Sequence, residues 1–155
     1  MKIAIFGSNG LLGTAASRQF AAGGHQVVRI SRSEEADYAA DASDIAAVEK
    51  IVSREKPEVV LNAIKSAQST DAAEEQRAVA WASNVIVPQN LASLCEKFSC
   101  KLVHISSDWV YEGRESEVYT EESLPYPQNF YAYTKAVAEE RVRLLCPGSL
   151  ILRTT

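Results

Sequence analysis

Apolar residues along the chain fall into short continuous runs and longer runs with helical spacing. The short runs are rich in valine, isoleucine and leucine, as buried strands of parallel sheets are. They lie at 1–6, 25–31, 37–41, 58–64, 102–105 and 149–153. Helical spacing occurs at 11–22, after 43, at 74–98 and from 131 onward. Strands that alternate with helices in this way predict an α/β fold of the Rossmann type, a doubly wound parallel sheet with helices on both faces.

A glycine-rich turn, Gly7-Ser-Asn-Gly10-Leu-Leu-Gly13, joins the first strand to the first helix. Glycine permits a positive φ and a close approach of the backbone to a phosphate, whose charge the free N–H groups of the helix start stabilise. The spacing is Gly-x-x-Gly-x-x-Gly instead of the commoner Gly-x-Gly-x-x-Gly, and a purely structural turn is the alternative. Its position between strand and helix favours a dinucleotide site. The cofactor-binding candidates here are Gly7, Asn9, Gly10, Leu11, Leu12 and Gly13.

The ends of the second and fourth strands carry further candidates. Arg32 follows the second strand, between Ser31 and Ser33. An arginine there suits the 2′-phosphate of NADP, whereas a carboxylate would suit the 2′-hydroxyl of NAD. NADP is therefore the expected cofactor, with NAD and a merely solvated arginine as the alternatives. Ala63 and Ile64, at the end of the fourth strand, are expected to pass beside the cofactor.

Residues suited to proton transfer follow the fifth strand. The run 102–105 ends in Ser106 and Ser107, and Tyr131 and Lys135 stand four apart at the start of a helix, hence on one face. A phenol donates a proton usefully near neutral pH if a neighbour lowers its pKa of roughly 10, and Lys135 is expected to do so. Ser107 would orient a substrate carbonyl and Tyr131 would exchange the proton as hydride moves. A surface pair on a helix is the alternative for Tyr-x-x-x-Lys.

Composition excludes several classes of function. The 155 residues are 46% apolar, which is enough for one domain with a core. A net charge of −4 without a Lys/Arg cluster argues against nucleic acid or acidic membranes as partners. Cys95, Cys100 and Cys146 have no metal-ligand spacing and are expected to be buried apolar residues, so no metal is expected. These cysteines favour a reducing cytoplasm, and a soluble protein is predicted because no apolar stretch reaches the ~18 residues that span a membrane.

Local signals also predict element boundaries. Asp41 or Ser43 is expected to cap the helix that follows the third strand. The segment 74–98 is expected to form one long helix that Pro88 bends. Trp81, on its apolar face, is expected to belong to the core.

These features together resemble the short-chain dehydrogenase/reductase superfamily. The segments His104-Ile-Ser-Ser-Asp-Trp-Val-Tyr-Glu-Gly113 and Pro125-Tyr-Pro-Gln-Asn-Phe-Tyr-Ala-Tyr-Thr-Lys135 resemble its extended branch, in particular the dTDP-4-dehydrorhamnose reductase family and the similar regulatory β subunit of methionine adenosyltransferase. The resemblance extends over essentially the whole chain. It implies a cytoplasmic NAD(P)H-dependent reductase of a 4-keto sugar nucleotide or similar ketone.

Site residues can be carried over by position. The resemblance implies that Ser107 replaces the family's active-site Thr/Ser, that Tyr131 is the acid/base, and that Lys135 also holds the nicotinamide ribose. Asp41 matches the residue near the adenine. Outside the glycine turn, the implied cofactor contacts are Arg32, Asp41, Ala42, Ala63, Ile64, Ser106, Tyr131 and Lys135.

The chain also departs from the family pattern. Trp109 and Tyr111 stand where the family usually has Tyr and Phe, and Lys65 stands where it has a small residue. Family members continue into a C-terminal region that grips the sugar nucleotide and that residues 1–155 lack. A non-catalytic NADP-binding regulatory or truncated module therefore stays open beside the reductase.

The resemblance also suggests a homodimer. Extended-family members often dimerise through the helices that correspond to 74–98 and to the Tyr131 helix. These helices carry the apolar residues Val85, Ile86 and Val137, and one core is not expected to bury all three. The alternative is that all three face the sheet.

Overall fold

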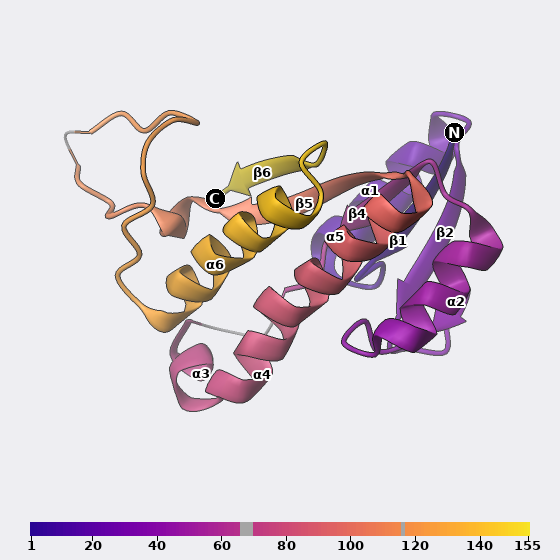
Figure 1. The fold of residues 1–155 in the computed structure, drawn as a ribbon, viewed down its shortest axis with the longest axis horizontal. Coiled ribbons are helices and arrows are strands. Elements are labelled where there is room, and N and C mark those ends of the chain that lie inside the picture. Colours follow the sequence, from indigo (N-terminus) through magenta and orange to yellow (C-terminus); the bar gives the residue numbers. More distant parts are fainter. Residues whose placement is uncertain (66–69, 116) are drawn as a thin grey trace.

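A computed structural model describes residues 1–65, 70–115 and 117–155 as one sheet with its covering helices (Figure 1). The strands are β1 (Lys2–Phe6), β2 (Gln26–Ser31), β3 (Tyr38–Ala39), β4 (Val59–Asn62), β5 (Lys101–Ser107) and β6 (Leu150–Thr154). The helices are α1 (Leu11–Ala22), α2 (Ile45–Glu55), α3 (Thr70–Glu75), α4 (Arg77–Trp81), α5 (Val87–Phe98) and α6 (Phe130–Leu145). A π-helical segment, η1 (Ala82–Ile86), precedes α5, and a 3₁₀ turn, η2 (Asp108–Val110), follows β5.

All the strand pairs are parallel, in the order β3-β2-β1-β4-β5-β6. This is the order of a Rossmann fold, so the predicted fold class is confirmed. The strand order reverses between β1 and β4, and Phe6 pairs with Asn62 where these two strands end. Ligands of such sheets bind at the carboxyl ends of the strands beside this reversal. The fold therefore directs attention to the segments that follow β1, β4 and β5.

The two faces of the sheet are covered by different helices. α1 packs on one face, and α2, α5 and α6 pack on the other, where α5 and α6 lie side by side (Figure 1). The larger buried cluster, on the α5 face, includes Phe6, Ile30, Leu91, Leu102 and Val142. The smaller cluster, on the α1 face, includes Ile3, Ile5 and Leu61. Alternate residues of the strands thus feed both faces, as the continuous apolar runs predict.

The predicted cap of α2 is wrong. Asp44, directly before the helix, is the N-cap, and its carboxylate accepts hydrogen bonds from the backbone N–H groups of Ala46 and Ala47 at 3.0 and 3.2 Å. Asp41 instead accepts from the backbone N–H of Ser43 at 2.9 Å. Both aspartates close tight turns with side-chain oxygens, so residue type alone did not identify the cap.

The long helix predicted at 74–98 is divided into shorter parts. α3 ends at Glu75, α4 begins at Arg77, and the π-helical segment η1 separates α4 from α5. Pro88 lies in the first turn of α5, directly after η1. Proline has no N–H to donate and its ring clashes with the carbonyl four residues earlier, so the wider π turn accommodates it. Trp81 is half-buried and packs on Tyr133, with ring centroids 6.5 Å apart, rather than deep in the core.

The expectations for the cysteines and for the apolar helix residues can also be compared with the structure. Cys95, Cys100 and Cys146 are buried, as predicted, and each is a free thiol. Val85 is buried in the core, so it is not part of an exposed apolar surface, whereas Ile86 is half-buried. Throughout the described ranges, no helix has the length and apolar character needed to cross a bilayer.

Candidate active site

The glycine turn connects β1 to α1 and touches the end of β4. Gly7 has a φ of 81°, and a Cβ at this position would lie 2.9 Å from the backbone of Ala63. A Cβ at Gly13 would lie 2.1 Å from the carbonyl oxygen of Gly7. Any larger residue at either position would force these backbones apart. The sequence thus brings the start of α1 and the end of β4 to one place.

The start of α1 is open to an anion. Gly10 is the N-cap, so no side chain caps the helix, and the first turn contains no acidic residue. Asn9 and Leu11 are exposed, Leu11 to 95%, and Leu12 is exposed as well. The uncapped N–H groups and the positive end of the helix dipole can therefore accept a phosphate.

The predicted adenosine-side residues gather at the ends of β2 and β3. Arg32 is exposed, and its charge contributes to a lowered pKa of Asp41, for which the first cause is the backbone hydrogen bond from Ser43. Ser31 accepts a hydrogen bond from the backbone N–H of Ser33 at 3.1 Å. Ala42 differs from its neighbours, because it is only 4% exposed and packs in the core. Arg32 and Asp41 thus offer a cation and a hydrogen-bond acceptor at one edge.

Two anchors fix the start of α6. Asn129 is the N-cap, and its side chain accepts from the backbone N–H of Ala132 at 2.8 Å. The carboxylate of Glu74, on α3, accepts from the backbone N–H of Phe130 at 2.6 Å. Both contacts satisfy N–H groups that have no partner within the helix. They hold the first turn of α6, which carries Tyr131, in a defined position.

Tyr131 lies beside Ser107, the last residue of β5. Burial raises the pKa of Tyr131, while a hydrogen bond with Ser107 opposes this shift and the charge of Asp108 adds to it. The rings of Tyr131 and the half-exposed Trp109 pack edge to face, with their centroids 6.4 Å apart. Tyr131 is therefore a protonated phenol at neutral pH, next to a hydroxyl that can orient a carbonyl.

Lys135 does not act on Tyr131 as the sequence predicted. Its ammonium group donates to the carbonyl oxygen of Ile105 at 2.6 Å, and its charge is not among the causes of the Tyr131 shift. Burial lowers the pKa of Lys135 to about 8, Glu139 opposes this shift and Lys65 adds to it. The prediction of a phenol with a lowered pKa is therefore wrong for this structure, since burial dominates at both groups.

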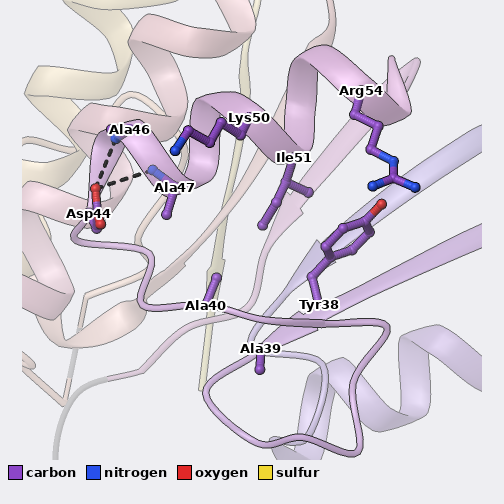
Figure 2. Close-up of a pocket in the computed structure, with 9 residues that line it drawn as sticks. All are labelled: Tyr38, Ala39, Ala40, Asp44, Ala46, Ala47, Lys50, Ile51 and Arg54. Atoms are coloured by element: carbon purple, nitrogen blue, oxygen red, sulfur yellow. Dashed lines mark hydrogen bonds between the residues drawn. The ribbon is translucent and has the colours of Figure 1, made fainter.

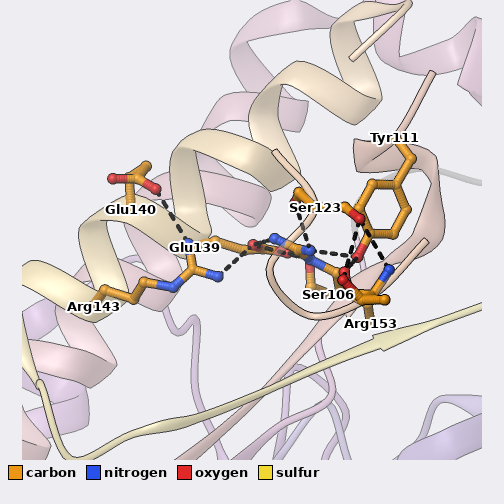
Figure 3. Close-up of polar contacts among 8 residues, drawn as sticks. Ser106, Tyr111, Ser123, Glu139, Glu140, Arg143 and Arg153 are labelled. Carbon is orange, nitrogen blue, oxygen red and sulfur yellow. Dashed lines mark hydrogen bonds and ion pairs between the residues drawn. The ribbon is translucent and has the colours of Figure 1, made fainter. Parts of the chain in front are cut away.

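Ser106 has a different partner from Ser107. Its hydroxyl donates to the carboxylate of Glu139 at 2.6 Å, on the α6 side of the sheet (Figure 3). Glu139 also binds Arg153 of β6. Sequence reasoning gave neither residue a role in the site, although the spacing Lys-x-x-x-Glu places Glu139 one turn after Lys135. An arginine at the end of an apolar strand was the second signal, because such a charge needs a partner.

A buried polar pair joins β4 to β5. The side-chain nitrogen of Asn62 lies 3.1 Å from Nδ1 of His104, and Asn62 also accepts from the backbone N–H of Ile64. Burial first, and then the charge of Lys135, lower the pKa of His104 well below its usual value. His104 is therefore neutral. It lies close enough to Lys135 for the ammonium to disfavour its protonated form, and it is only 1% exposed.

A groove between β3 and α2 is lined by residues on either side of Asp41 and Ala42 in the chain, but not by Asp41 or Ala42 themselves (Figure 2). Ala39, Ala40 and Ile51 line it, and Lys50 and Arg54 stand at its side. It contains none of the predicted catalytic or cofactor-binding residues. The functional site is thus better defined by the strand ends than by this hollow.

The parallel sheet with its glycine turn at the strand reversal, and Ser107 beside Tyr131 on the first turn of α6, define the extended short-chain dehydrogenase/reductase class. Residues 1–155 match the family model described as "RmlD substrate binding domain". The chain belongs to this family.

Relatives of known name agree with this assignment. The chain is 31% identical over 157 residues to the dTDP-4-dehydrorhamnose reductase of Mycobacterium tuberculosis H37Rv, covering 99% of this chain and 49% of the relative. It is 32% identical over 151 residues to methionine adenosyltransferase 2 subunit beta of Xenopus laevis, covering 96% and 45%. The dTDP-4-dehydrorhamnose reductase of Bacillus anthracis, solved in complex with NADP, matches with a TM-score of 0.89 and 27% identity, covering 98% and 52%. The chain thus spans about half the length of the relatives it matches.

Proposed function

We propose that the chain is the cofactor-binding and catalytic part of an NADPH-dependent reductase of a 4-keto sugar nucleotide. The observation that carries this proposal is the protonated Tyr131 beside Ser107, at the strand ends next to the glycine turn. The reductase names of the relatives and the NADP complex of the Bacillus anthracis protein support it.

NADPH would lie across the carboxyl ends of β1, β2 and β4. Its pyrophosphate would bind the open start of α1 at Gly10 and Gly13, and its 2′-phosphate would pair with Arg32. One N–H of the Lys135 ammonium is used by Ile105, and the others could donate to the nicotinamide ribose. Ala63, whose backbone lies against Gly7, would place only a methyl group beside the cofactor.

The chemical roles follow from the protonation states. When bound, the reduced nicotinamide would supply a hydride to the carbonyl carbon of the substrate. Tyr131, whose raised pKa keeps its proton, donates it to the carbonyl oxygen, and Ser107 orients that oxygen by a hydrogen bond. Reduction uses the phenol as an acid, so a lowered pKa is unnecessary in this direction. The half-exposed ring of Trp109, which packs edge to face with Tyr131, would form one wall of the substrate site.

Substrate selectivity is proposed to need residues outside this chain, since the relatives are about twice as long. Lys65 is exposed after β4 and offers a cation to a substrate phosphate. We also propose a cytoplasmic setting, which the unpaired buried cysteines support. A homodimer through α4 and α6 remains part of the proposal, now carried by the half-exposed Tyr133 with Trp81 and Val137.

The direct test is NADPH oxidation by the full-length product of the reading frame that encodes the chain. With a dTDP-4-keto-6-deoxy sugar present, absorbance of the reduced nicotinamide should fall, and without the sugar it should not. Binding of NADPH without any turnover of 4-keto sugar nucleotides would contradict the reductase. That outcome would favour a non-catalytic regulatory subunit, the alternative that the likeness to the Xenopus laevis protein supports.

A further inference from the structure

Glu139 is a buried carboxylate with every oxygen occupied. It is 0% exposed, and it lies one helical turn after Lys135 on α6. Oε1 accepts from the Ser106 hydroxyl at 2.6 Å and from Nε of Arg153 at 2.9 Å. Oε2 accepts from Arg153 at 2.6 Å and from Arg143 at 3.0 Å. Buried charges persist when they are paired and hydrogen-bonded in this way.

The charge of Glu139 is stable over the neutral range. Burial alone would raise the pKa of Glu139, but hydrogen bonds from Arg153 and Ser106 and the charges of Arg153 and Arg143 outweigh burial and lower it. Arg153 is itself mostly buried, with 12% of its side chain exposed. One carboxylate between two guanidinium groups thus forms a fixed ionic centre inside the fold (Figure 3).

Three segments of the proposed site meet at this centre. Ser106 is the neighbour of Ser107 on β5, and Glu139 stands one turn from Lys135 on α6. Arg153 continues to Tyr111, donating to its hydroxyl and lying over its ring with 4.8 Å between Cζ and the ring centroid. Tyr111 in turn donates to the carbonyl of Thr120 at 2.7 Å, which holds the loop after β5.

The charged groups around Lys135 affect whether its ammonium stays protonated, and Glu139 is one of these groups. Lys65, after β4, disfavours the protonated form of Lys135, and Glu139 is the group on α6 that favours it. His104, on β5, is neutral, so it supplies no compensating charge, and Tyr131 is a protonated phenol. Within the described residues, Glu139 is therefore the anion that opposes burial at Lys135.

We propose that Glu139 is a positioning residue of the reductase site: clamped by Arg153, it fixes Tyr131 and Lys135 on α6 against Ser107 on β5 and sustains the positive charge of the Lys135 ammonium. This inference rests on the proposed function for the use of Lys135 toward NADPH. The ionic centre itself is a feature of the fold and can be tested separately. Nothing in it requires Glu139 to touch the cofactor or the substrate.

The test is Glu139→Gln, which keeps the shape of the side chain and removes its charge. The matched control is Glu140→Gln, because Glu140 is the next residue on α6, binds the same Arg143 at 3.2 Å, and has a 73% exposed side chain. The titration of Lys135 is followed by NMR on isotope-labelled lysine, with its signal assigned by Lys135→Met. NADPH binding is measured over the same pH range.

Glu139→Gln should move the Lys135 titration midpoint to lower pH by half a unit or more, and the alkaline loss of NADPH binding should move with it. Glu140→Gln should leave both in place. An unchanged midpoint in folded Glu139→Gln would overturn the inference. Absence of NADPH binding by the unmodified protein would instead contradict the proposed function, while the midpoint would still decide the role of Glu139.

If Glu139→Gln does not fold, as judged by circular dichroism, Arg143→Gln takes its place. Arg143 is half-exposed, and its removal leaves the charge of Glu139 less neutralised. Without Arg143 the ionic centre carries one positive charge less, so its net potential at Lys135 becomes more negative and the Lys135 midpoint should rise. A midpoint that stays unchanged would overturn the inference in this variant as well.

Discussion

Lys135→Met should stabilise the fold while it weakens cofactor binding. Burial lowers the pKa of Lys135 from 10.5 to about 8, which at about 1.4 kcal/mol per pH unit costs about 3 kcal/mol at pH 7. Methionine has a similar volume and no charge, but the hydrogen bond to Ile105 is lost, at about 1.5–3 kcal/mol. We therefore expect a net gain of about 1 kcal/mol in the free energy of unfolding at pH 7.

The pH dependence of this difference is the sharper quantity. The folded pKa of Lys135 lies below the unfolded one, so the unfolded chain holds more protons between about pH 8 and 10.5 and stability rises with pH in that interval. The variant lacks this rise. Its advantage of about 1 kcal/mol at pH 7 should therefore become a disadvantage of about 1 kcal/mol at pH 9.5, a change of about 2 kcal/mol.

Urea unfolding of both proteins at the two pH values measures this difference, and Lys101→Met, at an exposed lysine on β5, controls for the substitution itself. The reasoning would be refuted if the difference in unfolding free energy between Lys135→Met and the unmodified protein were equal at both pH values. Lys135 would then titrate alike in the folded and unfolded states.

Two further predictions concern residues of the proposed cofactor site, the first for binding and the second for stability. Arg32→Ala should weaken NADPH binding by about 1–3 kcal/mol, roughly 5- to 150-fold, and should change NADH binding little, as measured by fluorescence titration. Equal losses of affinity for both cofactors would remove Arg32 from the phosphate site. Gly13→Ala should destabilise the fold by about 3 kcal/mol and lower Tm by about 10 °C, because its Cβ would meet the carbonyl of Gly7 at 2.1 Å. Gly148→Ala is its control, since nothing lies within 4 Å of that Cβ, and equal melting of the two glycine variants would contradict the argument.

The fold could be predicted from the chain because its signals are local and agree with one another. The apolar runs predicted the six strands, and most strand boundaries differ from the prediction by one or two residues. The glycine turn marked the place where the strand order reverses. The division of 74–98 was not predicted. The π-helical segment avoids a clash between Pro88 and the preceding turn, and the spacing of apolar residues carries no information about such a clash.

The proximity of two proposed site residues was predictable, but the electrostatics of the site were not. Tyr131 and Ser107 do lie together, as their places at a helix start and a strand end predict. Which charge acts on which group depends on burial, and burial is set by tertiary packing that sequence spacing does not contain. For the same reason the partnership of Glu139 and Arg153 was not predicted, since it joins α6 to β6 only in the folded chain.

The central claim is that Tyr131 donates the proton in a ketone reduction. Tyr131→Phe removes only the hydroxyl and keeps the ring against Trp109, so the full-length protein should bind NADPH as before while turnover of the 4-keto sugar nucleotide falls by ~10²-fold or more. Tyr133→Phe, at the half-exposed tyrosine two residues further on α6, should keep full turnover. Turnover by Tyr131→Phe equal to that by Tyr133→Phe would contradict the account.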